Sequence, residues 1–535
     1  MQYLWWKHGV IYQIYPRSFQ DSDGDGIGDL KGVIERLDYL NDGTEHSLGV
    51  DAIWFSPTFP SPMKDFGYDV SDYEDVHSDF GDLAAMDRLI DEAHKRDIRI
   101  ILDFVPNHTS SLHPWFIESR SSKDSPKRDW YVWRDAKDEG SPPNNWIGQF
   151  GGPAWEWDQK TQQYYLHSFL VEQPDLNWRN PAVEHAMHNV LRFWLDRGID
   201  GFRIDVMDRI LKDPDMRDNP PEPNRELARR AGQAALQRHI YDHNWPDIID
   251  AVRKIRRVVD EYQERMTVGE VFGPPAQIVE YYGGPALDGL HLAFNFPFVR
   301  IFDDRWTAEH VRARVDAFEA AMPPGGWPNH VFGNHDVDRL ISRINRDGRG
   351  AERARVAAML LLTLRGTPFI YYGEEIGMKN VAVPENRLQD PARIYGRGRD
   401  PERTPMQWSD RGGFSNSEPW LPYGDLSVSV EAQRRDPASM LSLYRRLNWC
   451  RRKSNALRFG DYAAIDGLPA GIYGYTRTSG DERTLTLLNF TNDPQSFELP
   501  EMLNPAEVLV GTHDAPPPSR KIALRPNEGL LFRLE

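Results

Sequence analysis

The chain has 535 residues, too many for one small domain and enough for a large core with insertions. Its 64 Lys and Arg stand against 81 Asp and Glu, and the resulting net charge of −17 excludes nucleic acid and anionic membranes as expected partners. Hydrophobic residues make up 40% of the chain, as in folded globular proteins. No apolar run reaches the roughly 18 residues of a membrane span, so we expect no membrane partner either.

Cysteine content and the first residues bear on the compartment. The single cysteine, Cys450, excludes an intramolecular disulfide and a cysteine metal cluster, and we expect it to be a buried small hydrophobe. The opening segment MQYLWWKHGV has neither the basic region nor the apolar core of a secretory signal. We therefore expect a cytoplasmic protein.

Short apolar runs typical of strands alternate with amphipathic helical patterns along most of the chain. The predicted strands are 10–15, 50–56, 99–105, 200–206, 266–271, 290–295, 330–334 and 367–372. The predicted helices are 30–40, 83–96, 183–197, 248–261, 308–321 and 352–364. Right-handed crossovers make such strands parallel, and eight of them close a barrel. We predict an α/β fold, a (β/α)8 TIM barrel.

Three stretches depart from this alternation. Residues 106–177, rich in Trp, Pro, Gly and Asn, are too long for one crossover and predict an insertion subdomain after the third strand. Residues 377–430 form an irregular segment after the eighth strand, and short β runs from about 460 onward predict a C-terminal antiparallel β-sandwich domain. The predicted division is 1–105 and 178–458 for the barrel, 106–177 for the insertion and 459–535 for the C-terminal domain.

The fourth predicted strand carries charge inside an apolar run. In Gly201-Phe-Arg-Ile-Asp205 the side chains alternate, so Arg203 and Asp205 share one face. Buried charges are costly unless paired, and a guanidinium beside Asp205 would keep it ionised, as a nucleophilic carboxylate requires. The alternative is an ion pair that merely closes one end of the barrel.

Further acids and imidazoles follow other predicted strands. The fifth strand ends at Glu270, the seventh leads into Asn334-His335-Asp336, and the third ends in Asp103-Phe-Val-Pro-Asn-His108. Active sites of such barrels lie at the carboxyl ends of the strands, where neighbouring strands would bring Asp205 and Glu270 together. Two carboxylates about 5 Å apart form the pair of a retaining glycosidase. We expect the pKa of Glu270 to be raised so that it can donate a proton.

The segment from Asp21 to Asp29 reads Asp-Ser-Asp-Gly-Asp-Gly-Ile-Gly-Asp. Aspartates at alternate positions with intervening glycines are typical of a loop that wraps a hard cation. The twelfth position, where an EF-hand has its closing Glu, is Gly32, so this is no full EF-hand. The alternative is a solvated turn without metal.

Several motifs occur together. They are Trp5-Trp6, Tyr12-Gln-Ile-Tyr-Pro-Arg-Ser18, Asp103-Phe-Val-Pro-Asn-His108, Gln173-Pro-Asp-Leu-Asn177, Gly201-Phe-Arg-Ile-Asp205, Val268-Gly-Glu270, Asn334-His-Asp336, Gly366-Thr-Pro-Phe-Ile-Tyr-Tyr-Gly-Glu-Glu375 and Arg403-Thr-Pro-Met-Gln-Trp408. In this combination the chain resembles glycoside hydrolase family 13, the α-amylase family, and within it the α-glucosidase and oligo-1,6-glucosidase branch. The resemblance runs in strong motifs to about residue 458.

The resemblance implies roles for particular residues. Asp205 would be the nucleophile, Glu270 the acid/base and Asp336 the third acid, which holds sugar hydroxyls. The terminal glucose would be enclosed by Asp65, Tyr68, His108, Arg203, His335 and Arg399, with Phe150 and Phe169 as walls. The aspartate loop resembles the calcium or magnesium site of the branch, a structural ion held by Asp21, Asp23, Asp25, the Ile27 carbonyl and Asp29.

The implied activity is that of a retaining exo-acting α-glucosidase on short α-glucosides such as maltose, isomaltose or sucrose, with possible transglucosylation and no organic cofactor. In this branch a valine after the nucleophile, here Val206, accompanies activity on α-1,6 bonds, but ordinary β-propensity also explains a valine there. The alternatives are a strict oligo-1,6-glucosidase and a glucosyl-transferring isomerase of the trehalose or isomaltulose synthase type. A non-catalytic scaffold would have lost the carboxylates. The expected partner is a small oligosaccharide, and the chain is expected to be a monomer or a homodimer.

Overall fold

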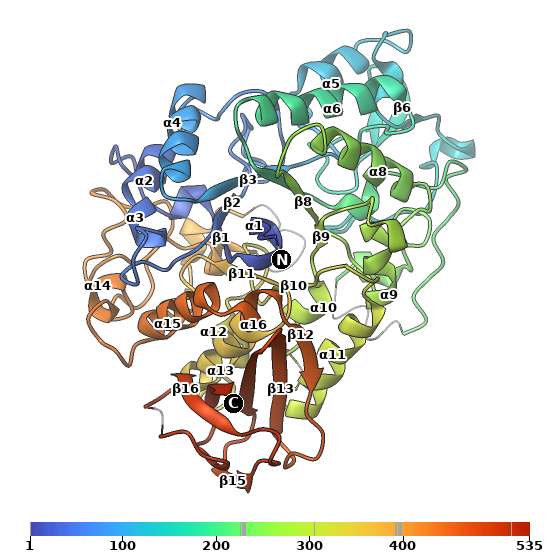
Figure 1. The fold of residues 1–535 in the computed structure, drawn as a ribbon. Coiled ribbons are helices and arrows are strands. Elements are labelled where there is room, and N and C mark those ends of the chain that lie inside the picture. The colour runs from blue at the N-terminus through green and yellow to red at the C-terminus, as the bar shows by residue number, and fades with distance from the viewer. Residues whose placement is uncertain are drawn as a thin grey trace.

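A parallel sheet of eight strands forms the centre of the computed structural model, which describes residues 2–224, 226, 232–303, 305–390, 393, 398–514 and 516–535. The strands follow the order β10-β11-β1-β2-β3-β7-β8-β9. The sheet curls into a nearly closed barrel with β9 and β10 as its edges (Figure 1). Their bounds are β1 (Ile11–Ile14), β2 (Ala52–Phe55), β3 (Arg99–Phe104), β7 (Gly201–Ile204), β8 (Met266–Gly269), β9 (Leu292–Ala293), β10 (Asn329–Val331) and β11 (Thr367–Tyr371). The predicted (β/α)8 fold is confirmed.

The alternation of strand side chains separates two cores. Trp54, Ile101 and Val268 belong to the cluster that fills the barrel. The intervening residues, such as Leu102 and Phe202, pack outward against the helices. The surrounding helices are α2 (Leu30–Glu35), α3 (Leu37–Leu40), α4 (Leu83–His94), α6 (Pro181–Asp196), α8 (Ile248–Val259), α11 (Ala308–Ala321) and α13 (Gly350–Thr363).

Helix starts are set by side-chain caps. The carboxylate of Asp82 accepts from the amide of Ala85 at the start of α4, and Thr307 caps α11 in the same way. The helix predicted over 30–40 is instead two short helices, because Arg36 leaves helical geometry with φ −107° and ψ 2°. Its guanidinium lies over the ring of Trp408, 4.3 Å from the centroid.

Smaller sheets lie on either side of the barrel in Figure 1. Between β3 and β7 the chain forms α5 (Pro114–Ser119) and a three-stranded sheet of β4 (Trp133–Arg134), β5 (Trp155–Asp158) and β6 (Gln163–Leu166). After α15 (Met440–Lys453) and α16 (Asn455–Phe459) comes an antiparallel sheet of β12 (Asp461–Ala464), β13 (Ile472–Ser479), β14 (Glu482–Asn489), β16 (Pro505–Gly511) and β18 (Gly529–Leu534). Strands β15 (Gln495–Glu498) and β17 (Lys521–Leu524) pair separately. The C-terminal β-sandwich is confirmed.

The predicted domain boundaries stay predictions. Part of the irregular segment 377–430 lies outside the described residues. Within the described part it contains the short 3-10 helices Glu385–Arg387 and Asp400–Glu402, and helix α14 (Val430–Gln433) begins at its last residue. Remaining short helices are α1 (Trp5–His8), α9 (Pro275–Ile278), α10 (Phe296–Val299) and α12 (Leu340–Ile344).

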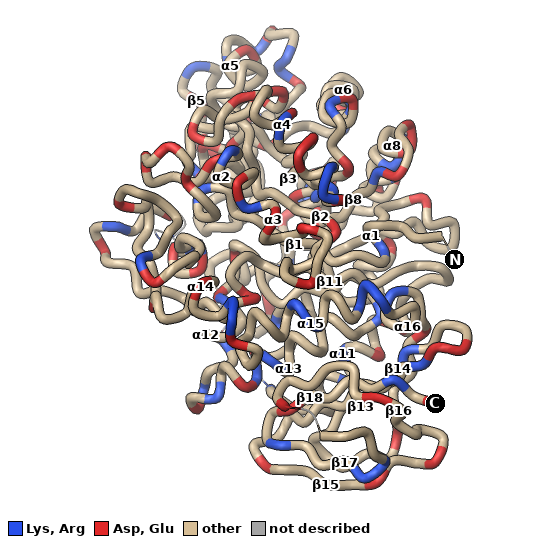
Figure 2. The backbone as a smooth tube through the Cα atoms, turned by 60° about the vertical axis from the view of Figure 1, so that its left-hand side comes forward, with Lys and Arg blue, Asp and Glu red and all other residues tan. Residues whose placement is uncertain are grey.

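Residues of both charge signs are distributed along the backbone through all parts of the fold (Figure 2). Among the described residues every helix is too short or too polar to cross a bilayer.

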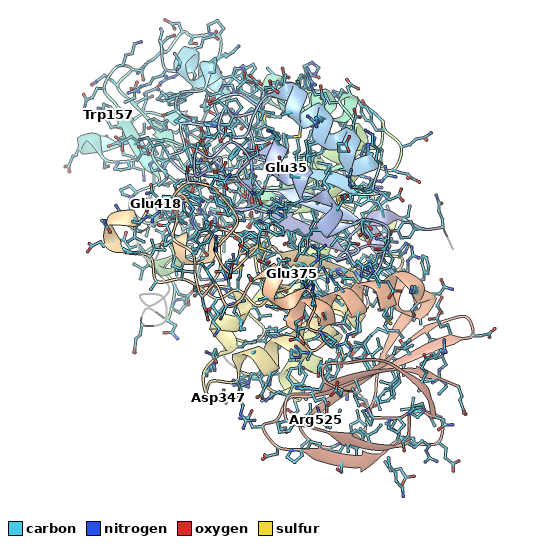
Figure 3. All side chains as sticks on the ribbon, turned by 90° about the vertical axis from the view of Figure 1, so that its left-hand side faces the viewer. Glu35, Trp157, Asp347, Glu375, Glu418 and Arg525 are labelled. Carbon is cyan, nitrogen blue, oxygen red and sulfur yellow. The ribbon has the colours of Figure 1, made fainter. Side chains whose placement is uncertain are left out.

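Glu375, labelled near the middle of Figure 3, is fully buried and accepts hydrogen bonds from the hydroxyls of Tyr12 and Tyr39. Cys450 is half-buried rather than buried as expected, and its burial raises the pKa of the thiol to about 12.

Candidate active site

Strand register brings the predicted carboxylates to one rim. Strands β7 and β8 pair Ile204 with Gly269, so Asp205 and Glu270 both come directly after the paired residues. Strand β3 pairs Asp103 with Arg203. The acids of three neighbouring strands therefore surround one guanidinium at the carboxyl end of the sheet.

Arg203 is fully buried and binds all three acids. Its Nη1 donates to Asp103 at 2.8 and 3.0 Å and to Asp205 Oδ1 at 2.7 Å, and its Nη2 donates to Glu270 Oε2. The amide of Val206 also donates to Glu270, at 3.2 Å. A single cation thus faces three carboxylates, too little charge for all of them to stay ionised in a buried site.

The excess of carboxylates shows in their proton affinity. Burial raises the pKa of Asp103 to about 7 despite Arg203. Burial also raises the pKa of Asp205 well above its usual range; Arg203 opposes this rise and the Glu270 carboxyl adds to it. The neighbouring Asp103 and Glu270 carboxyls both favour the protonated form of Asp205 and so add to its raised pKa. The raised pKa that the sequence predicts for Glu270 stays a prediction.

A second cationic cluster holds Asp336. Its Oδ1 accepts from Arg399 at 2.9 Å and from Arg403 at 3.1 Å. Burial would raise the pKa of Asp336, but His335 and these two arginines lower it below the usual range, so this acid stays ionised. Arg399 also donates to Asp65 at 2.6 Å. A polar cavity adjoins Asp336, lined further by Arg300, Asp303, Val337, Asp338 and Arg343.

The remaining predicted residues are neutral and packed together. The hydroxyl of Tyr68 lies 3.0 Å from Asp103 and 2.7 Å from His335 Nε2. Nε2 of His108 lies 3.1 Å from the carbonyl of Tyr68 and 3.1 Å from the amide of Gln173. Burial lowers the pKa of His108 to about 4 and that of His335 to about 3, so both rings are uncharged at neutral pH.

Two aromatic rings from the insertion cover this cluster. Phe169 lies 5.0 Å from the ring of His108 and 6.0 Å from the ring of Phe150. The Arg399 guanidinium lies over Phe150, 5.5 Å from its centroid. Both rings therefore lie beside residues that are predicted to enclose the glucose, and their role as walls stays a prediction.

Val206 does not lie in a strand, contrary to the predicted strand 200–206. Strand β7 ends at Ile204, and Val206 has φ +34° and ψ 49°, in the left-handed region. A β-branched residue is rarely found there, and such strain costs about 1–3 kcal/mol. β-Propensity therefore does not explain this valine.

Several residues of the site are missing from the predicted set. Asp103 lies beside Arg203, and Arg403 lies beside Asp336. Both residues stand in motifs that carry the family resemblance, which was the available signal in the sequence. Phe272 follows Glu270 by two residues, is 41% exposed and stacks on Phe296 at 4.7 Å and 9°. Nothing in the sequence indicates that these two rings meet.

The aspartate loop gathers part of its predicted ligand set. Carboxylate oxygens of Asp21, Asp23 and Asp29 lie within 4.8 Å of one another. Asp25 instead accepts from the amide of Ile27 at 2.7 Å. The three converging carboxylates suit a hard cation, although Asp21 and Asp29 also accept from backbone amides of the loop.

The fold and the acidic residues at the carboxyl ends of the barrel strands together define a (β/α)8-barrel glycoside hydrolase. More narrowly, the chain belongs to the α-amylase family, since the family model "Alpha amylase, catalytic domain" matches residues 13–460. This confirms the resemblance seen in the sequence.

Similar proteins cover nearly the whole chain. A probable α-glucosidase of Rhizobium meliloti is 44% identical over 94% of this chain and 92% of its own length. An oligo-1,6-glucosidase of Parageobacillus thermoglucosidasius is 38% identical over the full length of both. The crystal structure of the α-glucosyl transfer enzyme XgtA superposes with a TM-score of 0.91 at 38% identity, covering 100% of both chains.

Proposed function

We propose that this protein is a retaining exo-acting α-glucosidase that releases α-glucose from the non-reducing end of short α-glucosides. The observation that carries the proposal is that one guanidinium, Arg203, binds both Asp205 and Glu270. Retaining glycosidases hold their two carboxyl groups about 5–5.5 Å apart, whereas inverting ones leave about 6.5–9.5 Å for a water molecule. Two acids on adjacent nitrogens of one side chain fit the shorter separation.

The chemistry is a double displacement. Asp205 attacks the anomeric carbon while Glu270 protonates the glycosidic oxygen, which breaks the C–O bond and leaves a β-glucosyl ester on Asp205. Glu270 then takes a proton from water, the water oxygen attacks the anomeric carbon, and glucose leaves with its α configuration retained. A sugar hydroxyl in place of water gives transglucosylation.

The charge of the proposed nucleophile differs between the free protein and the reacting complex. In the free protein, burial and the neighbouring Glu270 carboxyl favour the protonated form of Asp205. Positive charge that develops on the anomeric carbon favours the ionised form of Asp205, so the reaction proceeds with the proton on Glu270, where the acid is needed. Arg203 stabilises the nucleophile in this state.

The closed end of the site supports exo-action. Asp65, Arg399 and Asp336 form a chain of charge-assisted hydrogen bonds, and His108 with Phe169 completes the wall. Planar, bidentate groups of this kind suit the adjacent hydroxyls of a terminal glucose. Asp336, kept ionised, would accept from the 2- and 3-hydroxyls and help to distort the ring.

Linkage preference is proposed to depend on Val206. Its side chain is 5% exposed, directly after Asp205, and its amide contacts Glu270. Relatives named oligo-1,6-glucosidase support competence on α-1,6 bonds. Strict α-1,6 preference remains an alternative.

A glucosyl-transferring isomerase is the second candidate. The stacked Phe272 and Phe296 offer an apolar platform two residues from Glu270, suited to hold an acceptor sugar against water. One solved structure similar to this chain, at 35% identity and a TM-score of 0.89, is an isomaltulose synthase variant from Erwinia rhapontici NX5 with its natural substrate sucrose.

The aspartate loop is proposed to bind structural Ca²⁺ or Mg²⁺. Asp21, Asp23 and Asp29 would supply carboxylate ligands, and Asp25 and the Ile27 carbonyl would join after a local change in the loop. The cytoplasmic compartment and the monomeric or homodimeric state stay predictions.

A product profile on maltose, isomaltose, sucrose and trehalose tests the proposal. We expect free glucose, released first as the α-anomer in an NMR time course, and at least about a 1000-fold loss of kcat in Asp205→Asn. Release of the β-anomer would exclude retention. Isomeric disaccharides with little free glucose would favour the isomerase instead.

A further inference from the structure

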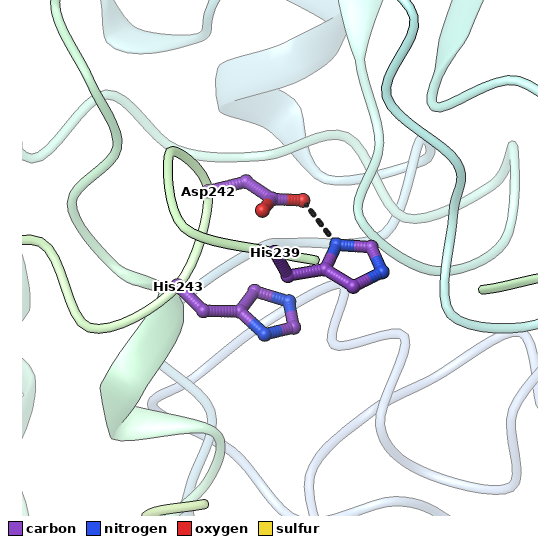
Figure 4. A group of neighbouring side chains, drawn as sticks. All are labelled: His239, Asp242 and His243. Carbon is purple, nitrogen blue, oxygen red and sulfur yellow. Dashed lines mark hydrogen bonds and ion pairs between the residues drawn. The ribbon is translucent and has the colours of Figure 1, made fainter. Parts of the chain in front are cut away.

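A cluster of metal-ligating side chains lies outside the carboxylate rim, in the segment between β7 and α8. His239, Asp242 and His243 each offer one ligand atom, and these atoms lie within 4.8 Å of one another. Figure 4 shows the carboxylate of Asp242 directed at the ring of His239, with the ring of His243 alongside. The side chains of His239 and Asp242 are 15% and 10% exposed, so the cluster is shielded but reachable.

Both ring nitrogens of His239 face hydrogen-bond acceptors. Nε2 lies 2.8 Å from the carbonyl oxygen of Ala234, and Nδ1 lies 2.8 Å from Oδ2 of Asp242. A neutral imidazole has one N–H, which the carbonyl of Ala234 takes, so Nδ1 would direct a lone pair at a carboxylate. A positive charge between Nδ1 and Oδ2, either a proton or a metal ion, removes this repulsion.

The other two side chains are also suited to bind a metal ion. Oδ2 of Asp242 faces His239, and its Oδ1 accepts from the side-chain amide of Asn219 at 2.9 Å. The ring of His243 stacks on that of His239 at 4.5 Å and 12°, and its nitrogens have no hydrogen-bond partner among the described residues. A neutral imidazole has one nitrogen with a free lone pair, which His243 can supply to a metal ion.

We propose that His239, Asp242 and His243 bind one divalent cation of the zinc class. Two imidazoles and one carboxylate form a ligand set that such borderline ions prefer, with a fourth position for water. Bonds of about 2.0–2.2 Å place tetrahedral ligands roughly 3.4 Å apart, so small side-chain rotations close the site. The carbonyl of Ala234 and the amide of Asn219, which donates to Asp242 Oδ1 at 2.9 Å, are outer partners that fix the ligands.

Two nearby cations do not block the site. Arg209 and Lys212 lie near enough to His243 for their charges to act on it. Arg209 lies 3.9 Å from Asp208 and Lys212 lies 2.6 Å from Asp175, so each is paired with a buried carboxylate. Their field on a bound ion is therefore largely offset.

A bound ion would stabilise the contact between this segment and the insertion. The neighbouring Gln237 donates to the carbonyl of Asn145 at 2.5 Å, and Gln233 accepts from the amide of Gly152 at 2.9 Å. Residues 145–152 include Phe150, the ring beside Arg399. The proposed site would thus stabilise one wall of the active site without contacting substrate.

Calorimetric titration of the full-length chain with ZnCl2 tests the proposal. The protein is first treated with a chelator and then kept in CaCl2 throughout, so that the aspartate loop is occupied. We expect one equivalent of zinc to bind, and His243→Asn and Asp242→Asn each to weaken binding by more than about tenfold. Cobalt(II) in place of zinc should give the visible absorption bands of a four-coordinate site, and both variants should lose them.

The matched control is His46→Asn, an exposed histidine on another loop. It should bind zinc as the unaltered chain does. Absence of a one-equivalent site, or equal binding by His243→Asn, would overturn the proposal and leave the cluster a hydrogen-bonded pair of His239 and Asp242. If Asp242→Asn fails to fold, His243→Asn decides, since its ring gives up no hydrogen bond to described residues.

Discussion

Arg203 donates to Oδ1 of Asp205 from two residues earlier in the chain, at 2.7 Å, because the side-chain alternation of β7 continues to Asp205, the first residue after the strand. The same guanidinium reaches Glu270 and Asp103 through its other donors. A guanidinium presents its donors in a fixed plane on separate nitrogens, whereas an ammonium is one compact charge with rotatable donors and does not fix the positions of three acids in the same way. The geometry of the proposed nucleophile and acid/base thus depends on one residue.

Arg203→Lys should therefore lower kcat by about 100- to 1000-fold, the effect of losing one preorganised donor at a reacting group. Rates on an aryl α-glucoside measure it. Arg192→Lys, which alters a surface ion pair with Glu261, is the control and should keep full activity. Equal rates for both variants would contradict the role given to Arg203.

Val206→Ala should lower the ratio of kcat/KM for isomaltose to that for maltose by about tenfold, since one or two methyl groups in a pocket shift discrimination by about 1–3 kcal/mol. The left-handed backbone fixes the Val206 side chain beside Asp205. Val258→Ala, in a buried face of α8, loses the same atoms away from the site and should leave the ratio unchanged. An unchanged ratio in Val206→Ala would remove this residue from linkage selection.

Phe272→Ala should reduce transfer products relative to free glucose at high substrate concentration. The stacked ring of Phe272 is the exposed part of the proposed acceptor platform. Loss of an aromatic contact worth about 1 kcal/mol weakens acceptor binding about fivefold. Tyr3→Ala, a similarly exposed aromatic at 38%, is the control. A constant product ratio would argue against the platform.

Periodicity was sufficient to predict most of the fold. Helix α11 has the predicted bounds of 308–321, and each predicted barrel strand has a counterpart, because alternating and 3.6-residue patterns follow directly from burial on one face. The same alternation predicted that Arg203 and Asp205 would lie side by side.

Local backbone geometry and contacts between distant loops could not be predicted in this way. The positive φ of Val206 cannot be predicted from a hydrophobic pattern. The stacking of Phe272 on Phe296 and the convergence of His239 with His243 depend on how loops turn after the strands end. The raised pKa of Asp205 depends on burial, which the sequence does not quantify.

Asp23→Ala should remove most of the thermal stabilisation that Ca²⁺ or Mg²⁺ gives, which is about 2.7 kcal/mol at 100 times Kd. Asp23 is exposed and caps no helix, whereas Asp29 caps α2, so Asp23 separates ion binding from folding. Melting temperatures with and without each ion measure the effect. Asp72→Ala is the control, since this exposed aspartate accepts from the amide two residues on, as Asp23 does. Equal responses in both variants would leave the loop a metal-free turn.

Glu374→Gln should change how stability depends on pH. Burial raises the pKa of Glu374 from 4.5 to about 7, with Glu375 adding to the rise and Arg339 and Arg343 opposing it. Between these values the folded chain binds a proton that the unfolded chain has released, so the free energy of unfolding falls as pH rises, by up to about 3 kcal/mol. Glutamine stays neutral and still accepts from the hydroxyl of Tyr444, which lies 2.9 Å from Glu374.

The variant should therefore lose this part of the pH dependence and exceed the unaltered chain in stability above pH 7. Denaturant unfolding at pH 5, 6, 7 and 8 measures the difference. Glu501→Gln serves as the control, because its side chain is 92% exposed and should shift no slope. Parallel curves of unfolding free energy against pH for the unaltered chain and Glu374→Gln would mean that Glu374 is ionised in the folded chain. Its site among Gly333, Tyr371 and Tyr444 would then be more polar than its burial indicates.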